Sequence, residues 1–147
     1  MDQEKLAEAL NISLVAPAIL NASLVKHMTE GSSIIFVGST LSEKAVHGRM
    51  SYVTVKHGMV GMMRSCAQDL FGMGIHTACI CPGFTNTPML QDAMAKGGDD
   101  AQRFIENFVS LRRLLTSEEI ARALVFAVEN PSVNGSVIHV NGGQRES

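Results

Sequence analysis

Tyr52 is the only tyrosine of the chain, and Lys56 follows it four positions later. On a helix, this spacing places both side chains on the same face, one turn apart. A neighbouring ammonium stabilises the phenolate form of a tyrosine. The phenol can then take a proton from an alcohol or give one to a carbonyl oxygen. The same two residues also fit a half-buried tyrosine beside a solvated lysine, so the pair alone leaves a catalytic and a structural role open.

A catalytic pair of this kind must be held beside a pocket by helices and strands. The spacing of hydrophobic residues predicts where these helices and strands lie. Apolar residues at three- and four-residue spacing predict helices over residues 3–28 and about 51–71. We expect Pro17 to kink the first of these helices. Short apolar runs predict three strands, over residues 33–37, 75–81 and 136–140. The run at 33–37 is continuous and β-branched, which is typical of a parallel strand buried on both faces.

A third helix is marked at its start by a capping box. Thr116 and Glu119 have the spacing of this motif, and the helix should continue to about Glu129. Between the second and third strands, residues 84–113 are polar and contain a Gly-Gly pair. We expect short helical patches there, forming a mobile segment over a pocket.

The order of helices and strands predicts an α/β fold in which residues 1–147 form a single domain. Alternation of this kind gives a parallel sheet, here of about three strands, with right-handed crossovers and flanking helices on both faces. Sites in such sheets form at the carboxyl ends of the strands. Three polar clusters are expected at these ends: residues 38–40, 82–87 and 141–143.

Composition excludes several classes of function. Apolar residues make up 46% of the chain, and the net charge is −2 without a basic block, so we expect neither nucleic acid nor an anionic membrane as a partner. Polar residues interrupt the apolar stretches, so we expect no membrane span, and the first residues do not resemble a signal peptide. The three cysteines match no metal or redox spacing. Cys79 and Cys81 alternate within an apolar run, so we expect them to be buried free thiols, and we expect no metal site and a cytoplasmic protein.

The catalytic residues resemble those of the short-chain dehydrogenase/reductase family. Ser39 precedes Tyr52 by 13 residues, as the catalytic serine of that family precedes its tyrosine, and Tyr52 with Lys56 matches the Tyr-x-x-x-Lys signature. Asn11 lies at about the place of the family's asparagine. The resemblance implies that Tyr52 is the acid/base and that Ser39 bonds the substrate oxygen. It implies that Lys56 stabilises the phenolate and holds the nicotinamide ribose, and that Asn11 anchors a water linked to Lys56.

Two later segments extend the resemblance. Residues 82–87 are similar to the family's Pro-Gly segment with its later threonine, and residues 134–143 resemble its closing strand and glycine pair. Thr87 is implied to contact the nicotinamide carboxamide or a cofactor phosphate. The resemblance implies NAD or NADP as cofactor, bound by Tyr52, Lys56, Pro82, Gly83 and Thr87.

The resemblance covers only the C-terminal half of the family pattern. A Gly-rich turn between a strand and a helix, which would hold the cofactor pyrophosphate, does not occur in the sequence. We therefore expect a partial Rossmann-like three-layer sandwich. One hypothesis is an NAD(P)-dependent oxidoreductase of an alcohol or ketone, with specificity set by residues 88–113. The other is a non-catalytic oligomerisation or interaction module. Both predict a homo-oligomer, whereas a serine hydrolase is poorly supported because Ser39 is not in a Gly-x-Ser-x-Gly turn.

Overall fold

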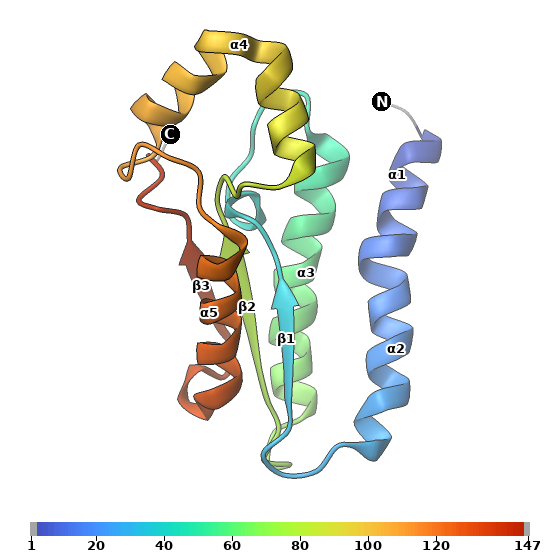
Figure 1. Cartoon of the computed structure of the whole chain (residues 1–147). Coiled ribbons are helices and arrows are strands. Elements are labelled where there is room, and N and C mark those ends of the chain that lie inside the picture. Colours follow the sequence, from blue (N-terminus) through green and yellow to red (C-terminus); the bar gives the residue numbers. More distant parts are fainter. Residues whose placement is uncertain (1–2, 146–147) are drawn as a thin grey trace.

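The structure is a computed structural model that describes residues 3–145. Helices and strands alternate along the chain as Figure 1 shows. The elements are α1 (Gln3–Leu10), the π-helical turn η1 (Asn11–Val15), α2 (Ala16–Leu24), the 3-10 turn η2 (Val25–His27), β1 (Ser33–Val37), the 3-10 turn η3 (Thr40–Ser42), α3 (Met50–Asp69), β2 (His76–Pro82), α4 (Pro88–Phe108), α5 (Ser117–Glu129), the 3-10 turn η4 (Pro131–Val133) and β3 (Ser136–Val140).

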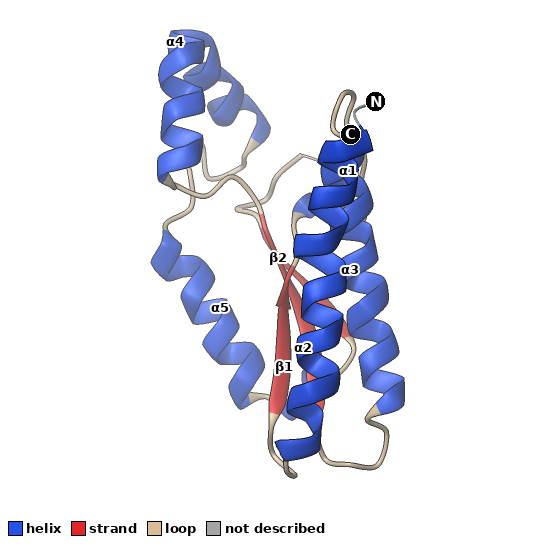
Figure 2. Cartoon of the chain, turned by 90° about the vertical axis from the view of Figure 1, so that its right-hand side faces the viewer, coloured by secondary structure: helices blue, strands red, loops and turns tan. Residues whose placement is uncertain are grey.

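The three strands form one parallel sheet in the order β1-β2-β3, which confirms the predicted α/β fold. The register pairs Phe36 with Cys79 and Cys79 with Val137. In Figure 2, α3 and the α1–α2 helix lie on one side of the sheet and α5 lies on the other. Each strand is connected to the next through a helix that packs on the sheet, as parallel strands require.

The core is divided between the two faces of the sheet because successive strand residues point to opposite sides. On the α3 side, Cys79 and Cys81 pack against Val60 and Met63. On the α5 side, Ala78 and Ile80 pack against Ile120 and Ala127. Fully burying one large apolar side chain stabilises a fold by roughly 1.5–3 kcal/mol, so both helices are held firmly to β2.

The side chains of strand β1 are less buried than the sequence predicts. Only Phe36 of this strand is buried, and Val37 is 44% exposed, so the expectation of burial on both faces is wrong. The reason is position: β1 lies at the edge of the described sheet, with β2 on one side only. Central β2, in contrast, is buried along nearly its whole length.

The first predicted helix forms, and it is continuous from Gln3 to His27. Upstream of Pro17 it contains the π-helical turn, in which the Ala16 N–H bonds the Asn11 carbonyl five residues back. Contrary to the expectation that polar residues interrupt it too often, this helix is long and apolar enough to cross a membrane by length and composition. In the structure it packs along α3, where Leu14 occupies the space that a side chain at Gly58 would need.

The segment before α5 contains short helical stretches separated at its glycines, as predicted. The span labelled α4 comprises two helices that meet at a kink, where Gly98, with φ 56° and ψ −143°, has non-helical geometry. Glycine tolerates this conformation, so the Gly-Gly pair ends the first helix and lets the chain turn into the second. The far end of α4 is tied to the segment after β3, because the Ser110 and Leu111 amides donate to the carbonyls of Gly143 and Gly142.

Candidate active site

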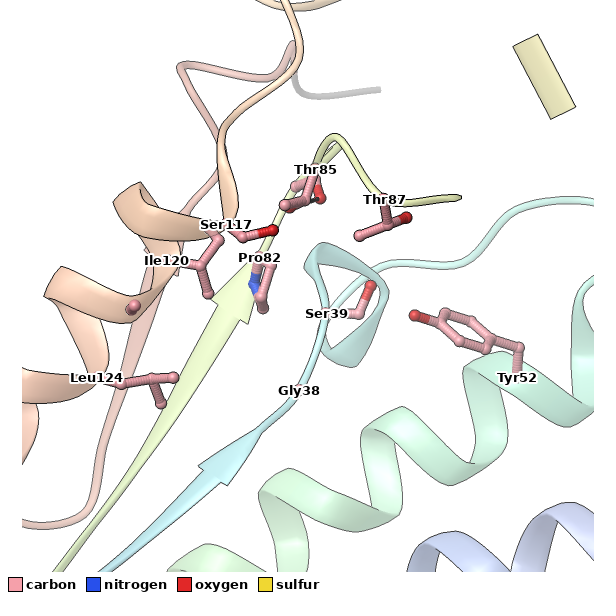
Figure 3. Close-up of a pocket in the computed structure, with 11 residues that line it drawn as sticks. Gly38, Ser39, Tyr52, Pro82, Thr85, Thr87, Ser117, Ile120 and Leu124 are labelled. Atoms are coloured by element: carbon pink, nitrogen blue, oxygen red, sulfur yellow. Dashed lines mark hydrogen bonds between the residues drawn. The ribbon is translucent and has the colours of Figure 1, made fainter. Parts of the chain in front are cut away.

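A cleft of about 370 Å³ lies at the carboxyl ends of β1 and β2. Three elements enclose it: the start of α3, the segment that leads from β2 to α4, and the first two turns of α5 (Figure 3). The side chains and backbone that line it belong to Gly38, Ser39, Tyr52, Pro82, Gly83, Thr85, Thr87, Ser117, Ile120, Ala121 and Leu124. The structure thus brings Ser39, Tyr52 and the predicted Pro-Gly segment around one space.

Ser39 is held rigidly because it caps a short helical turn directly after β1. Its hydroxyl accepts a hydrogen bond from the Leu41 amide at 3.1 Å, and its own amide donates to the Ser42 hydroxyl at 3.0 Å. This reciprocal arrangement is a capping box. The Ser39 side chain is nearly buried, at 8% exposed. Its O–H proton is still available for a substrate oxygen, since a hydroxyl can donate one bond while accepting others.

Tyr52 faces Ser39 from the opposite wall. It lies in the first turn of α3, and its side chain is 45% exposed. In Figure 3 the phenolic oxygen points across the cleft toward the Ser39 hydroxyl. A small carbonyl or alcohol oxygen between them could therefore contact both hydroxyl groups.

Lys56 and Asn11 lie outside the cleft lining. The Lys56 ammonium donates to the Val37 carbonyl at 3.0 Å and lies 5.7 Å from the centre of the Tyr52 ring. It therefore contacts the edge of β1 and the face of the phenol, a cation–π distance. Asn11 begins the π-helical turn with its side chain exposed. The roles of both residues stay predictions.

The cleft has the groups needed for the nicotinamide end of a dinucleotide. Pro82, Ile120 and Leu124 provide apolar surface for a flat ring, and the hydroxyls of Thr85 and Thr87 stand at its edge. Thr87 also caps α4, accepting from the Leu90 amide at 3.4 Å, as the sequence suggests for a threonine before proline. The pyrophosphate end would need a Gly-rich turn, which the sequence does not contain.

Two buried thiols lie directly beneath the Ser39 turn. The Cys79 and Cys81 sulfur atoms are 3.9 Å apart, and both side chains are fully buried. Hydrogen bonding between them raises the pKa of the Cys79 thiol and lowers that of Cys81, whose sulfur also receives bonds from Ser42 and Ser39. The Gly38 backbone packs closely against the two sulfur atoms. The thiols therefore support the backbone that leads into Ser39.

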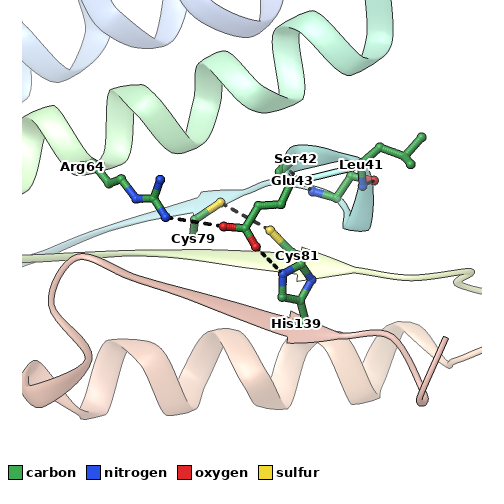
Figure 4. Close-up of polar contacts among 8 residues, drawn as sticks. Leu41, Ser42, Glu43, Arg64, Cys79, Cys81 and His139 are labelled. Carbon is green, nitrogen blue, oxygen red and sulfur yellow. Dashed lines mark hydrogen bonds and ion pairs between the residues drawn. The ribbon is translucent and has the colours of Figure 1, made fainter. Parts of the chain in front are cut away.

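A cluster of charged side chains at the surface holds the segment that follows Ser39. Glu43 accepts from His139 of β3 at 2.8 Å and from Arg64 of α3 at 3.4 Å, as Figure 4 shows. Exposed pairs of this kind are worth little individually, about 0–1 kcal/mol. Their geometric effect is to link the segment after Ser39 to two neighbouring elements.

Two features of the cleft differ from the sequence analysis. The wall formed by α5, including Ser117, Ile120 and Leu124, was missed, although the capping box at Thr116 marks a helix start that follows the β2 segment. Conversely, residues 141–143, expected at the site, do not line the cleft. Their backbone instead bonds the end of α4.

Comparison with known proteins places these residues in context. The profile of the family described as enoyl-(acyl carrier protein) reductase matches residues 1–145. The chain is 33% identical over 129 residues to a short-chain dehydrogenase of Aspergillus ruber, covering 86% of this chain and 47% of that protein. A short chain dehydrogenase family protein from Francisella tularensis superimposes with a TM-score of 0.87 at 26% identity, covering 97% of this chain and 63% of that one.

A further solved structure is a short chain dehydrogenase from Burkholderia cenocepacia in complex with NADP, with a TM-score of 0.86 and 25% identity. The superposition covers 97% of this chain and 58% of the Burkholderia cenocepacia chain. The chain thus spans about half the length of the curated relatives it matches.

Proposed function

Because the chain belongs to the short-chain dehydrogenase/reductase family, we propose that it supplies the proton-transfer site of an NAD(P)-dependent oxidoreductase acting on an alcohol or ketone. The observation that carries this proposal is the position of the Tyr52 phenol opposite the Ser39 hydroxyl in one cleft. NADP in the related Burkholderia cenocepacia structure supports the cofactor class.

The proposed chemistry follows from the two hydroxyl groups. In reduction, the Tyr52 O–H gives its proton to the substrate oxygen, and in oxidation the same oxygen takes that proton back. Ser39 donates a hydrogen bond to the substrate oxygen and stabilises the negative charge that develops there. The Leu41 amide bonds the Ser39 oxygen and so fixes the direction of this donor. The bound nicotinamide would supply or accept the hydride at the substrate carbon.

Lys56 and Asn11 act through Tyr52 in this proposal. The Lys56 ammonium lies over the phenol ring, 5.7 Å from its centre, at a cation–π distance. The Lys56 ammonium has three N–H donors, and one of them bonds the Val37 carbonyl, so others would remain for the hydroxyls of the nicotinamide ribose. Asn11 would anchor a water that links Lys56 to solvent.

Substitution of the phenol tests the proposal. With NADH or NADPH at millimolar concentration and a panel of ketones, Tyr52→Phe should lower kcat by about 10²–10⁴-fold, since it removes the general acid. The matched control is Phe71→Leu, because Phe71 is an exposed ring outside the cleft; it should keep the wild-type rate. Equal rates in Tyr52→Phe and wild type would exclude Tyr52 from the reaction. The absence of turnover with every ketone would favour the non-catalytic module.

A further inference from the structure

Ser42, the last residue of the η3 turn, is buried more deeply than Ser39. Its exposed fraction is 2%, against 8% for Ser39. Its hydroxyl oxygen accepts a hydrogen bond from the Ser39 amide at 3.0 Å, and this bond is buried as well. The proton transfer proposed for Tyr52 does not use the Ser42 hydroxyl. Buried polar groups are, as a rule, kept for the hydrogen bonds they make, so the partners of Ser42 indicate its role.

The bond from Ser42 acts on the residue whose hydroxyl lines the cleft. Ser42 holds the Ser39 amide, and the Leu41 amide holds the Ser39 hydroxyl oxygen at 3.1 Å. The backbone and the side chain of Ser39 are therefore each fixed by one bond within the same turn. Because the Ser39 oxygen already accepts from Leu41, its own proton is left for an acceptor in the cleft.

Two sulfur atoms lie beside the Ser42 hydroxyl, as Figure 4 shows for Cys79 and Cys81. A Cβ atom at Gly38 would meet the Ser42 oxygen and both sulfur atoms, so these three atoms converge on one point of the backbone. Both cysteine side chains are fully buried. The pKa of the Cys81 thiol is lowered chiefly by the bond from Cys79 and further by a bond from Ser42. The sulfur of Cys81 is thus the acceptor for the Ser42 proton.

These partners give the Ser42 hydroxyl a single orientation. Its proton is directed to Cys81, so a lone pair of its oxygen is left for the Ser39 amide. A serine hydroxyl without a fixed acceptor rotates and presents its proton in several directions. In a buried turn, where an unpaired amide is costly, the conformation of Ser39 depends on the orientation of this one hydroxyl.

We propose that Ser42 is a positioning residue of the reaction: by holding the Ser39 amide, it fixes the direction in which the Ser39 hydroxyl donates to the substrate oxygen. This proposal rests on the proposed oxidoreductase function. Ser42 does not line the cleft, so it acts only through Ser39, and Cys81 acts through Ser42.

The test is hydrogen exchange of single amides in the whole chain, followed by nuclear magnetic resonance. In Ser42→Ala, the Ser39 amide loses its acceptor and should exchange about tenfold faster. The Gly38 amide should keep its wild-type rate, because it donates to the Ile80 carbonyl at 2.7 Å. Thr40→Ser is the matched control, since it also removes one heavy atom from a buried side chain of this turn. It should leave both exchange rates unchanged.

A pair of cysteine variants decides the matter if Ser42→Ala does not fold. Cys81→Ala removes the acceptor of the Ser42 proton and should also accelerate exchange of the Ser39 amide. Cys79→Ala, an equal loss of volume in the same core, should not. The proposal is overturned if Ser39 exchange is unchanged in Ser42→Ala, if the Gly38 amide accelerates equally, or if the two cysteine variants exchange alike.

Turnover gives an independent readout. With a ketone and NADPH, Ser42→Ala should lower kcat by about 10- to 100-fold, because a misdirected donor slows the reaction, and it should leave KM nearly unchanged. Thr40→Ser should keep the wild-type kcat. Turnover with an unchanged kcat in Ser42→Ala would overturn the positioning role. Faster Ser39 exchange in Ser42→Ala, together with no turnover by the wild type, would support the hold on Ser39 and contradict the oxidoreductase only.

Discussion

Gly38 shows how closely the backbone at the cleft is packed. A Cβ atom at this position would lie 2.7 Å from the Ser42 hydroxyl and 2.8 and 2.9 Å from the sulfur atoms of Cys81 and Cys79. These three atoms are buried and belong to the support of Ser39. The requirement for glycine therefore comes from close approach and not from an unusual backbone angle.

Gly38→Ala should lower the free energy of unfolding by about 1–3 kcal/mol, because extra volume in a packed core forces neighbours out of place. The measurement is urea unfolding followed by circular dichroism. Gly61→Ala is the matched control, since a Cβ there meets no atom within 4 Å and the site is inside α3. It should stabilise the protein by about 0.5–1 kcal/mol. A Gly38→Ala protein as stable as wild type would contradict this prediction, because it would mean that the two thiol side chains move aside at little cost in free energy.

At the scale of single elements, helix α5 begins with a charged and capped turn. Glu119 accepts two hydrogen bonds from Arg113, at 2.8 and 2.9 Å, and one from the Thr116 amide at 2.8 Å. The Arg113 bonds, followed by the Thr116 bond, lower the pKa of Glu119 to about 2. This turn positions the α5 wall of the cleft.

The lowered pKa predicts a pH dependence of stability. A carboxylate whose folded pKa is depressed stabilises the fold above its unfolded pKa of about 4.3. This contribution is lost as the pH falls toward about 2, the folded pKa. In Glu119→Gln, which keeps the cap without the charge, the urea midpoint should fall less between pH 5 and pH 2 than in wild type. Glu118→Gln, at the exposed neighbouring position, should retain the wild-type slope, and equal slopes in all three proteins would contradict the prediction.

The elements differ in how well the sequence predicted them. Residues 33–37 and 136–140 form strands as expected, because short β-branched runs have few other stable arrangements, and the Thr116–Glu119 capping box formed as predicted. The short helical patches expected around Gly97 and Gly98 are confirmed, because α4 consists of two helices that meet at the Gly98 kink. The contribution of α5 to the cleft depends on how it packs across the sheet, which local patterns do not determine.

For the whole molecule, cofactor affinity is expected to be weak. Contacts from Lys56 and Thr87 amount to a few hydrogen bonds, each worth about 0.5–1.5 kcal/mol net. Association costs at least about 4 kcal/mol, so these terms nearly cancel. Titration calorimetry with NADH and NADPH should give dissociation constants in the millimolar range or no binding. Micromolar affinity would require a pyrophosphate site that the sequence does not reveal.

The outer face of the α1–α2 helix predicts self-association. Ile12, Ile19 and Leu20 are 65%, 65% and 55% exposed, and Ile12 and Ile19 lie two turns apart on one side. The unpaired edge of β1 is a second surface that could pair with another chain. We expect a homo-oligomer in sedimentation velocity at micromolar concentration, and dissociation in the double variant Ile12→Lys/Ile19→Lys. Gln68→Lys, a polar surface change on α3, is the control, and a wild-type monomer would contradict the prediction.

The bonds between residues 142–145 and the end of α4 also affect the order of folding during synthesis. Phe108, Ser110 and Leu111 acquire their backbone partners only after β3 and the segment behind it have left the ribosome. Chains emerge at roughly 5–20 residues per second, amino end first. The β1–α3–β2 unit can therefore assemble a few seconds before α4 is fastened at its far end. Until then, the residues at and just after the end of α4 lack these backbone partners.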